Sequence, residues 1–398
     1  MCGRIRKERP PRETQDALSI GFLGSYGGLN TGDEAILTSV LDAVRTLRPT
    51  ARLVVFSRNP EHTAAHHHVH DVIGWEHEPR AHMAASVARL DLLVLGGGGV
   101  LYDTESHRYL QVVQAANDAG VPVFVYAVGA GPLNDPEERA VARRVLTQAR
   151  DLVVRDQGSR LVLENAGIDR DIVVTADPAL LLRPVSFRRH RLDREGIPDD
   201  VRLVGMSVRE PGSAVEHLDV NAYHSLLALV ADFLVHRLDA HVLFMPMERD
   251  DVRHSHAVLS QMTDPARGRI LHGEVQPGEV LGLMDHLHLV VGMRLHFLMF
   301  AAMAGVPFLP LPYARKVSDF AMAAGVPGLR GVVREQAGPL LAEIDRLWDE
   351  RPARQLMVRE RVAALVERAA VTRDRLGYLL DDLDGAVPAR SAPPGGTA

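Results

Sequence analysis

The sequence predicts an α/β protein with two Rossmann-like domains that face each other across a cleft. Its 398 residues are too many for one ordinary core and suit two domains of moderate size. From Ser19 onward, short apolar runs alternate with amphipathic stretches, which is typical of parallel strands joined by helices. A polar, charged and proline-bearing segment at 183–200 separates two such series and predicts the crossing between the domains.

The first series consists of runs with the length and the branched-residue content of buried parallel strands. Helix-like stretches such as EAILTSVLDAVRTL (34–47) and EERAVARRVLTQA (137–149) lie between them. The expected strands are SIGFLG (19–24), RLVVFS (52–57), DLLVLGG (91–97), VPVFVYAVG (121–129), DLVVRD (151–156) and DIVVTAD (171–177).

The second series repeats the pattern and ends in a helical part rich in Leu, Ala, Arg and Glu, whose packing across the junction the sequence leaves open. Its expected strands are RLVGMSV (202–208), HVLFMPM (241–247), GRILHGE (268–274), HLVVGM (288–293) and VPFLPL (306–311). We therefore expect a disordered arm at 1–17, an N-terminal domain at 18–183, a C-terminal domain with terminal helices at 184–383, and a disordered tail at 384–398.

The composition of the chain excludes several classes of protein. Hydrophobic content of 46% and charged content of 24% are those of a soluble globular protein, and a net charge of -6 gives no support to nucleic-acid binding. The single cysteine, Cys2, excludes an internal disulfide and a cysteine-based zinc site, and it fits a cytoplasmic location. Residues 1–17 lack the apolar core of a secretory signal. The apolar run 290–308 contains Arg294 and is predicted as strand, helix and strand rather than a membrane span.

Glycines gather where ligands bind in open α/β sheets, beyond the carboxyl ends of the strands. The turn SYGGLNTGDEAIL (25–37) comes after the first strand, and Asp33 and Glu34 favour a helix start within it. Four consecutive glycines, 96–99, come after a later strand. Such glycines allow close approach of a ligand or of neighbouring backbone, and both interpretations stay open. The first of these turns, 25–37, is neither a GxGxxG fingerprint nor a P-loop.

Cations also come after the expected strands, at Arg155, at Arg209, at Arg294 with His296, and at Arg315 with Lys316. Arg294 and His296 fall in the first turn of the expected helix RLHFLMFAAMA (294–304), where the helix dipole favours anions. Cations at that place indicate that a negative group sits between them. The alternatives are a buried ion pair for Arg294 and a satisfied core histidine for His296.

The histidine-rich segment AAHHHVHD (64–71) resembles a metal-binding tract, and His62 and His66 would lie one helical turn apart. No closed ligand set accompanies them, so we expect a solvated surface segment and no metal site. The acidic group 248–251 has two interpretations, a cation-binding site and a loop charge cluster, and the second is expected. No GxSxG or HExxH motif occurs.

Taken together, the strand-end motifs resemble the polysaccharide pyruvyl transferase family. The matching pieces occur in order and are NTGDEAIL (30–37), LGGGGVLYD (95–103), VGAGP (128–132), VVRDQGS (153–159), TADPALLL (175–182), MSVR (206–209), GMRLHFLMFA (292–301) and VPFLPLPYARKVSDF (306–320). The resemblance implies a GT-B-like fold with the active site in the cleft. It also implies transfer of the pyruvyl unit of phosphoenolpyruvate to a sugar, which forms a ketal and releases phosphate.

The resemblance further implies roles for individual residues. His296 and Arg155 are the expected catalytic residues, with His296 as general acid or base. Arg294, Leu295, Arg209 and Lys316 are expected to bind phosphoenolpyruvate on the C-terminal side. The N-terminal glycine turns are expected to bind the acceptor, through Gly28, Asn30, Gly32, Asp33, Gly97 and Gly98. No cofactor and no metal are expected.

The expected partners are phosphoenolpyruvate and a sugar acceptor that is lipid-linked, nucleotide-linked or part of a glycan. We expect no nucleic acid and at most peripheral membrane contact, and a homo-oligomer stays open. Two alternatives remain: a GT-B-type glycosyltransferase that uses a nucleotide sugar, and a non-catalytic binding protein of a glycan pathway.

Overall fold

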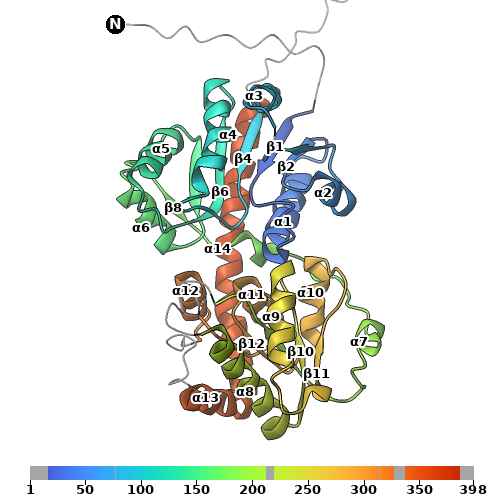
Figure 1. Cartoon of the computed structure of the whole chain (residues 1–398). Helices are drawn as coiled ribbons and strands as arrows, with labels where there is room; N and C mark the ends of the chain where they lie inside the picture. Colours follow the sequence, from blue (N-terminus) through green and yellow to red (C-terminus); the bar gives the residue numbers. More distant parts are fainter. Residues whose placement is uncertain (1–16, 77, 212–218, 313, 327–336, 386–398) are drawn as a thin grey trace, which may run out of the picture.

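The computed structural model describes residues 17–76, 78–211, 219–312, 314–326 and 337–385. Within them the chain forms two α/β units, one above the other in Figure 1, each built on a parallel sheet. The predicted α/β fold with two Rossmann-like domains is therefore confirmed. Residues 1–16 of the expected N-terminal arm and residues 386–398 of the expected tail lie outside the described residues.

The N-terminal unit alternates strands and helices as expected. Its strands are β1 (Ser19–Leu23), β2 (Arg52–Ser57), β3 (Asp71–Gly74), β4 (Leu92–Leu95), β5 (Gly99–Leu101), β6 (Val123–Ala130), β7 (Asp151–Val154) and β8 (Val173–Val174). Its helices are α1 (Thr31–Leu47), α2 (Pro60–His66), α3 (Arg80–Val87), α4 (Ser106–Asp118), α5 (Pro136–Leu146) and α6 (Gln157–Asn165). The sheet order is β3-β2-β1-β4-β6-β7-β8, with β5 paired to β6. Sequence reasoning missed β3 and β5, which span only four and three residues.

The C-terminal unit repeats the architecture with fewer strands. These are β9 (Arg202–Ser207), β10 (Ala240–Phe244), β11 (Gly268–Ile270), β12 (Leu289–Gly292) and β13 (Phe308–Pro310), in the order β11-β10-β9-β12-β13. The helices are α7 (His190–Arg194), α8 (Val220–Leu238), α9 (Arg249–Leu259), α10 (Pro277–Leu283), α11 (Leu295–Ala304), α12 (Arg315–Ala323) and α13 (Ala337–Asp349). The apolar run 290–308 forms strand, helix and strand, as predicted. Among the described residues, no helix combines the length and the apolar character needed to cross a membrane.

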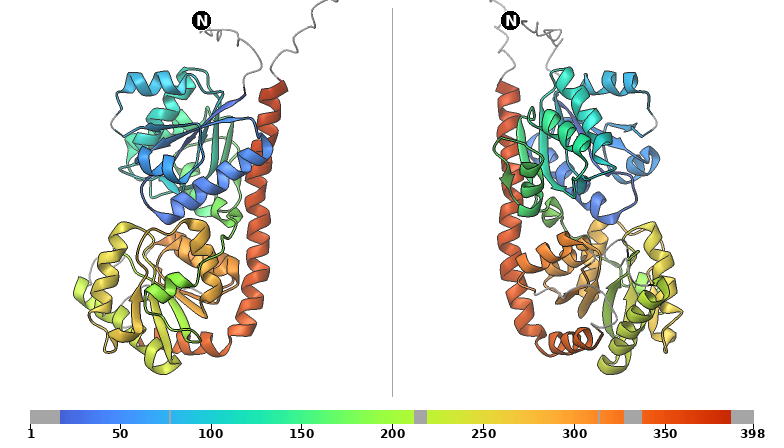
Figure 2. Two further views of the ribbon diagram at one scale, coloured as in Figure 1. Left: turned by 90° about the vertical axis from the view of Figure 1, so that its right-hand side faces the viewer. Right: turned by 60° about the vertical axis from the view of Figure 1, so that its left-hand side comes forward.

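The last helix, α14 (Arg351–Gly385), runs along both units, as Figure 2 shows. Its 35 residues span about 50 Å at a rise of 1.5 Å per residue. Val358 and Val362 pack into a core of the C-terminal unit, whereas Leu376 and Leu380 pack into a core of the N-terminal unit. The helix therefore crosses the junction, which the sequence had left open. It also includes Asp384 and Gly385, the first residues of the expected tail.

The two units also meet directly at the start of α1. The backbone N–H of Thr31 donates to the carbonyl of Met247 at 2.8 Å, and the side-chain amide of Asn30 donates to Glu248 at 2.7 Å. Ala35 and Ile36 of α1 belong to the same apolar core as α11. These contacts hold the carboxyl ends of the two sheets face to face.

Candidate active site

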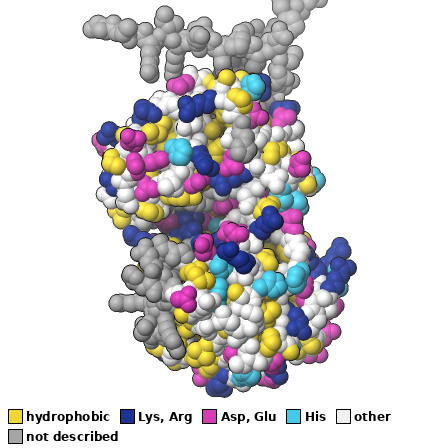
Figure 3. Space-filling model, viewed as in Figure 1, with side chains coloured by type: hydrophobic (Ala, Val, Ile, Leu, Met, Phe, Trp, Pro, Cys, Tyr) yellow, Lys and Arg dark blue, Asp and Glu magenta, His cyan; other side chains and the backbone are white. Residues whose placement is uncertain are grey.

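A cleft of about 790 Å³ lies between the two units, at the carboxyl ends of their strands. Figure 3 shows it as a hollow at the waist of the molecule, where acidic and basic side chains gather. Its wall combines the turns after β1 and β4, the ends of β6 and β7, and the starts of α11 and α12. The expected site residues that line it are Gly28, Asn30, Gly32, Asp33, Gly98, Arg155, Arg294, Leu295, His296 and Lys316.

His296 extends from the first turn of α11 toward the N-terminal unit. Its Nε2 lies 3.6 Å from Oδ2 of Asp177 and has no hydrogen-bond partner among the described residues. Only 12% of its side chain is exposed. A Cβ atom on Gly32 would lie 1.9 Å from Nδ1 of the ring, so a glycine is needed for α1 to approach this closely. The imidazole is therefore not the satisfied core histidine that the sequence left open.

Arg155 directly follows β7 and is held by two carboxylates. Nη1 donates to Asp177 Oδ2 at 3.0 Å, and Nε donates to Asp156 Oδ2 at 3.2 Å. Although burial raises the pKa of Asp177, the neighbouring His296 and Arg155 hold that pKa well below its usual range. Asp177 is thus an ionised carboxylate that joins both expected catalytic residues. Sequence reasoning quoted its motif, TADPALLL, without assigning it a role, although an acid at a strand end was the available signal.

Arg294 is the N-cap residue of α11 and forms the buried ion pair that was its alternative interpretation. Its Nε donates to Asp251 Oδ2 at 2.9 Å and its Nη2 to Asp251 Oδ1 at 2.5 Å, and it also pairs with Glu248. Both acids belong to the group 248–251, which was expected to be a loop cluster. The ion pair does not remove Arg294 from the site, because its side chain still lines the cleft.

Asp33 is a carboxylic acid of the cleft whose pKa is raised toward neutrality. Burial raises the pKa of Asp33 from 3.8 to about 6, against the opposing influence of His296, Lys316 and a hydrogen bond with Ser25. Perturbed pKa values of this kind cluster at functional sites. The sequence placed Asp33 on the acceptor side, and the structure brings it beside both His296 and Lys316.

Of the other residues that were expected to bind phosphoenolpyruvate, two line the cleft and one does not. Lys316 is exposed in the first turn of α12 and lines the cleft with Leu295. Arg209 comes shortly after β9 and does not belong to the cleft wall; its Nε donates to the carbonyl of Glu210. Its charge still reaches the cleft, because it helps to lower the pKa of Glu248 against the effect of burial. Tyr313, in the motif around Lys316, lies outside the described residues.

Some glycines of the turns that were expected to bind the acceptor line the cleft, whereas others pack against the interior of the protein. Gly98 faces the Asp33 carboxylate, since a Cβ atom there would lie 2.3 Å from Oδ1. Gly97, in contrast, is not part of the cleft wall and packs against Tyr26, where a Cβ atom would lie 2.7 Å from the ring. Asn30 lines the cleft but also caps α1, accepting from Gly32 N–H at 3.0 Å. Glycines of these turns therefore serve the cleft at some positions and close internal packing at others.

Solved structures of similar fold include UDP-N-acetylglucosamine 2-epimerases and an O-GlcNAc transferase. A UDP-GlcNAc 2-epimerase from Neisseria meningitidis bound to UDP-GlcNAc has a TM-score of 0.61 and 14% identity, covering 91% of this chain and 99% of its own. A UDP-N-acetylglucosamine 2-epimerase from Rickettsia bellii has a TM-score of 0.59 and 12% identity, with coverage of 93% and 98%. A mutant O-GlcNAc transferase from Thermobaculum terrenum has a TM-score of 0.50 and 15% identity, with coverage of 93% and 69%. At these identities the likeness shows the fold alone, which is GT-B-like.

Comparison of amino-acid sequences identifies the family, which likeness of fold alone does not. The amylovoran biosynthesis protein AmsJ of Erwinia amylovora is 20% identical over 410 residues, which cover 90% of this chain and 98% of that protein. The family model described as polysaccharide pyruvyl transferase matches residues 30–315, a range that includes the start of α1, the cleft strands and α11. The chain belongs to the polysaccharide pyruvyl transferase family.

Proposed function

We propose that this protein transfers the pyruvyl unit of phosphoenolpyruvate to two hydroxyls of one sugar. The first hydroxyl oxygen adds to C2 of the donor while C3 gains a proton. The C2–O bond to phosphate then breaks, and the second hydroxyl oxygen adds to C2. Of the two hydroxyl protons, one ends in the new methyl group and the other on the released phosphate. The products are a cyclic ketal and inorganic phosphate.

The observation that carries the proposal is the convergence of His296, Arg155 and Lys316 in one cleft between the two units. Phosphoenolpyruvate carries a carboxylate and a phosphate on a small frame, which several cations and hydrogen-bond donors can recognise together. The cleft volume of about 790 Å³ lies within the range of ligand pockets. It leaves space for a sugar beside the donor.

In the proposed mechanism, Arg294 binds the donor anion at the position that Glu248 occupies in this structure. Its partner Asp251 is fully buried, whereas Glu248 has a side chain that is 30% exposed at the cleft. In the proposed donor complex, a phosphate or carboxylate oxygen replaces Glu248 on the guanidinium and Asp251 stays bound. Arg294 is thereby held in place for an anion before the anion arrives.

His296 and Asp33 form the proposed acid–base pair. His296 has a ring nitrogen without a hydrogen-bond partner in the described structure, and Asp33 has a pKa of about 6. Groups that titrate near the operating pH are suited to general acid–base catalysis, which contributes about 10²–10⁴-fold. In the proposed mechanism His296 protonates C3 and Asp33 accepts a hydroxyl proton from the acceptor.

The acceptor is proposed to bind along the turns at Gly28 and Gly98, where the cleft wall lacks side chains. The Neisseria relative in fold is bound to UDP-GlcNAc, which motivates testing nucleotide-linked sugars first. The same likeness supports the rival proposal that this chain transfers a sugar from a nucleotide. A titration with each donor separates the two.

Calorimetric titration of phosphoenolpyruvate is the test, with the wild-type chain and the Lys316→Ala, Arg294→Ala and Arg346→Ala variants. We expect saturable binding to wild type, at least about 10-fold weaker binding to Lys316→Ala and Arg294→Ala, and no change in Arg346→Ala, whose α13 side chain is exposed away from the cleft. Lys316→Ala is the more informative variant, because Arg294→Ala also leaves Asp251 buried without its partner. If the wild-type chain binds and turns over UDP- or GDP-sugars as donors and ignores phosphoenolpyruvate, the proposal is wrong.

A further inference from the structure

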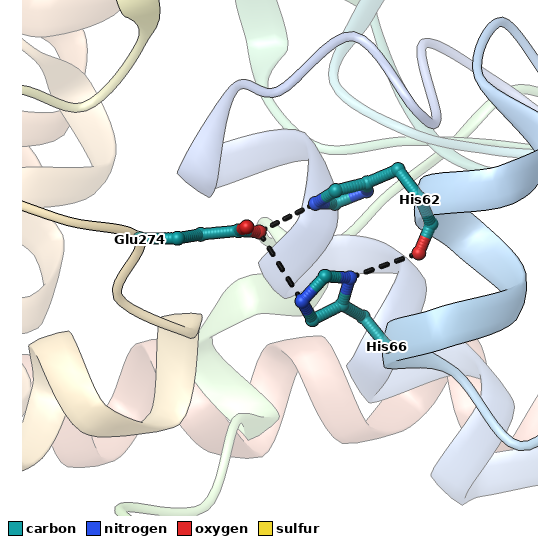
Figure 4. Close-up of side chains that lie close together, drawn as sticks. All are labelled: His62, His66 and Glu274. Carbon is teal, nitrogen blue, oxygen red and sulfur yellow. Dashed lines mark hydrogen bonds and ion pairs between the residues drawn. The ribbon is translucent and has the colours of Figure 1, made fainter.

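Two histidines of α2 meet a glutamate of the other unit outside the cleft. Figure 4 shows His62 and His66 side by side on one face of α2, with Glu274 extending toward both from the segment after β11. The nearest ligand atoms of the three side chains all lie within 4.8 Å of one another. Since His62 and Glu274 are 212 positions apart, no spacing in the sequence could show this cluster.

The helix presents the two imidazoles as a preformed pair. Asn59 caps α2 by accepting from His62 N–H at 3.2 Å, and Pro60 occupies the first turn. Residues four apart lie on the same helix face, and the two rings are 4.2 Å apart between centroids. The pair is thus oriented by a short, well-capped helix before any ligand binds.

A hydrogen bond of His66 determines which of its ring nitrogens can bind a metal ion. Its Nδ1 lies 2.9 Å from the backbone carbonyl of His62, and a carbonyl can only accept, so Nδ1 carries the proton. In the neutral ring, Nε2 then holds a lone pair, and this lone pair faces Oε1 of Glu274 at 3.5 Å. A lone pair that faces a carboxylate oxygen is stabilised by a cation between them, either a proton or a metal ion. An Nδ1–H bonded to a backbone carbonyl is also the usual orientation of a metal-ligating histidine.

We propose that His62, His66 and Glu274 bind a Zn²⁺ ion that links the two units. Two imidazoles and one carboxylate are a donor set that suits zinc, with water in the fourth tetrahedral position. Zinc–ligand distances of about 2.0–2.2 Å place tetrahedral ligands about 3.3–3.6 Å apart. His66 and Glu274 already have this separation. His62 Nε2 lies 2.5 Å from Glu274 Oε1, and a small outward movement of Glu274, which is 53% exposed, opens the space.

The ion would add a connection between the units beyond the contacts at the start of α1. α2 belongs to the N-terminal unit and Glu274 to the C-terminal unit, so binding requires the two to keep their relative placement. A ligand that binds only the folded, docked arrangement stabilises that arrangement by mass action. We therefore expect zinc to raise the melting temperature of the whole chain.

The test uses the full chain, stripped with a chelator and titrated with Co²⁺ as a spectroscopic substitute for Zn²⁺. The wild-type chain is expected to bind one equivalent with the intense visible absorption of tetrahedral cobalt. His66→Ala should abolish that spectrum. Glu274→Gln should weaken binding by at least the roughly 10–100-fold that loss of even an outer partner costs. At the same concentration, Zn²⁺ should raise the melting temperature of wild type more than that of Glu274→Gln.

His68→Ala is the matched control, because this exposed histidine belongs to the same segment and lies outside the cluster. It should bind Co²⁺ as wild type does. Unchanged affinity and spectrum in Glu274→Gln would reduce the site to a two-histidine chelate and overturn the proposed link. Weak absorption typical of octahedral cobalt, or loss of binding in His68→Ala, would also overturn it.

Discussion

Oδ2 of Asp177 lies 3.6 Å from Nε2 of His296, a residue of the opposite unit, and accepts a hydrogen bond from Arg155 at 3.0 Å. One carboxylate oxygen therefore connects the two residues that were expected to be catalytic. This carboxylate is ionised and buried, and its contact with Nε2 holds the ring of His296 at the wall of the cleft. The proposed proton transfer depends on this contact between the units.

His296→Ala should lower kcat for phosphate release by about 10²–10⁴-fold, the usual contribution of a general acid or base. The dissociation constant for phosphoenolpyruvate should change much less, since the cations that bind the donor remain. Single-turnover kinetics and calorimetry on the same preparation measure the two effects separately. Near-normal turnover in this variant would exclude the proton-transfer role.

Gly32→Ala should reduce turnover without any change in charge. The new Cβ would lie 1.9 Å from Nδ1 of His296, so either the ring or the docking of α1 must shift. Gly338→Ala is the control, because a Cβ atom at that helical position meets nothing within 4 Å. We expect steady-state activity to fall by at least about 10-fold in the first variant only, since a displacement of about 1 Å can cost 10²-fold. Equal activities would mean that the close approach is unimportant.

Asp33→Asn should make the protein more stable near pH 7 and less active. The pKa of Asp33 is about 6 in the folded chain and near 3.8 in the unfolded chain, so the folded state binds the extra proton between these values. Stability is therefore lost as pH rises through this window, by at most about 3 kcal/mol, which exceeds the roughly 0.3–1 kcal/mol that an acid gains in a first helical turn.

Urea unfolding between about pH 4 and pH 7.5 measures this effect. Wild type should lose stability across the window relative to Asp33→Asn, and Asp42→Asn, an exposed acid on the same helix, should behave as wild type does. The activity profile of wild type should also show a limb near pH 6, the pKa of Asp33. A pH dependence that is the same in Asp33→Asn and wild type would contradict the raised pKa.

Arg155→Ala should destabilise the fold by about 3–5 kcal/mol, because it leaves the carboxylate of Asp177 buried without a partner. The double variant Arg155→Ala/Asp177→Asn should recover part of that stability, since the uncompensated charge is gone. If Arg155 also acts on the substrate, the double variant is less active than the single variant Asp177→Asn, which has lost the same carboxylate beside His296. Chemical denaturation and turnover, measured together, distinguish a structural role from a functional one.

Many features of the site could be predicted from local pattern. Alternating apolar runs indicated parallel strands, and the residues after the carboxyl ends of parallel strands gather at one edge of the sheet. Arg155, Arg294, His296 and Lys316 were found in this way, and all four line the cleft. Arg209 satisfied the same rule and does not line it, because a position after a strand fixes the edge of the sheet but not the direction of a long side chain.

The sequence alone predicts the alternation of strands and helices. This alternation implies two parallel sheets, a cleft between them and the residues that lie near the edge of the cleft. These features depend on periodicities of a few residues, which local pattern reveals. The pairing of distant residues emerged only on folding: Asp177 with His296, Asp251 with Arg294, Glu274 with His62 and His66, and α14 with both units. Such contacts join positions far apart in the chain, 212 residues in the case of His62 and Glu274, and only the packing of the two units brings them within reach.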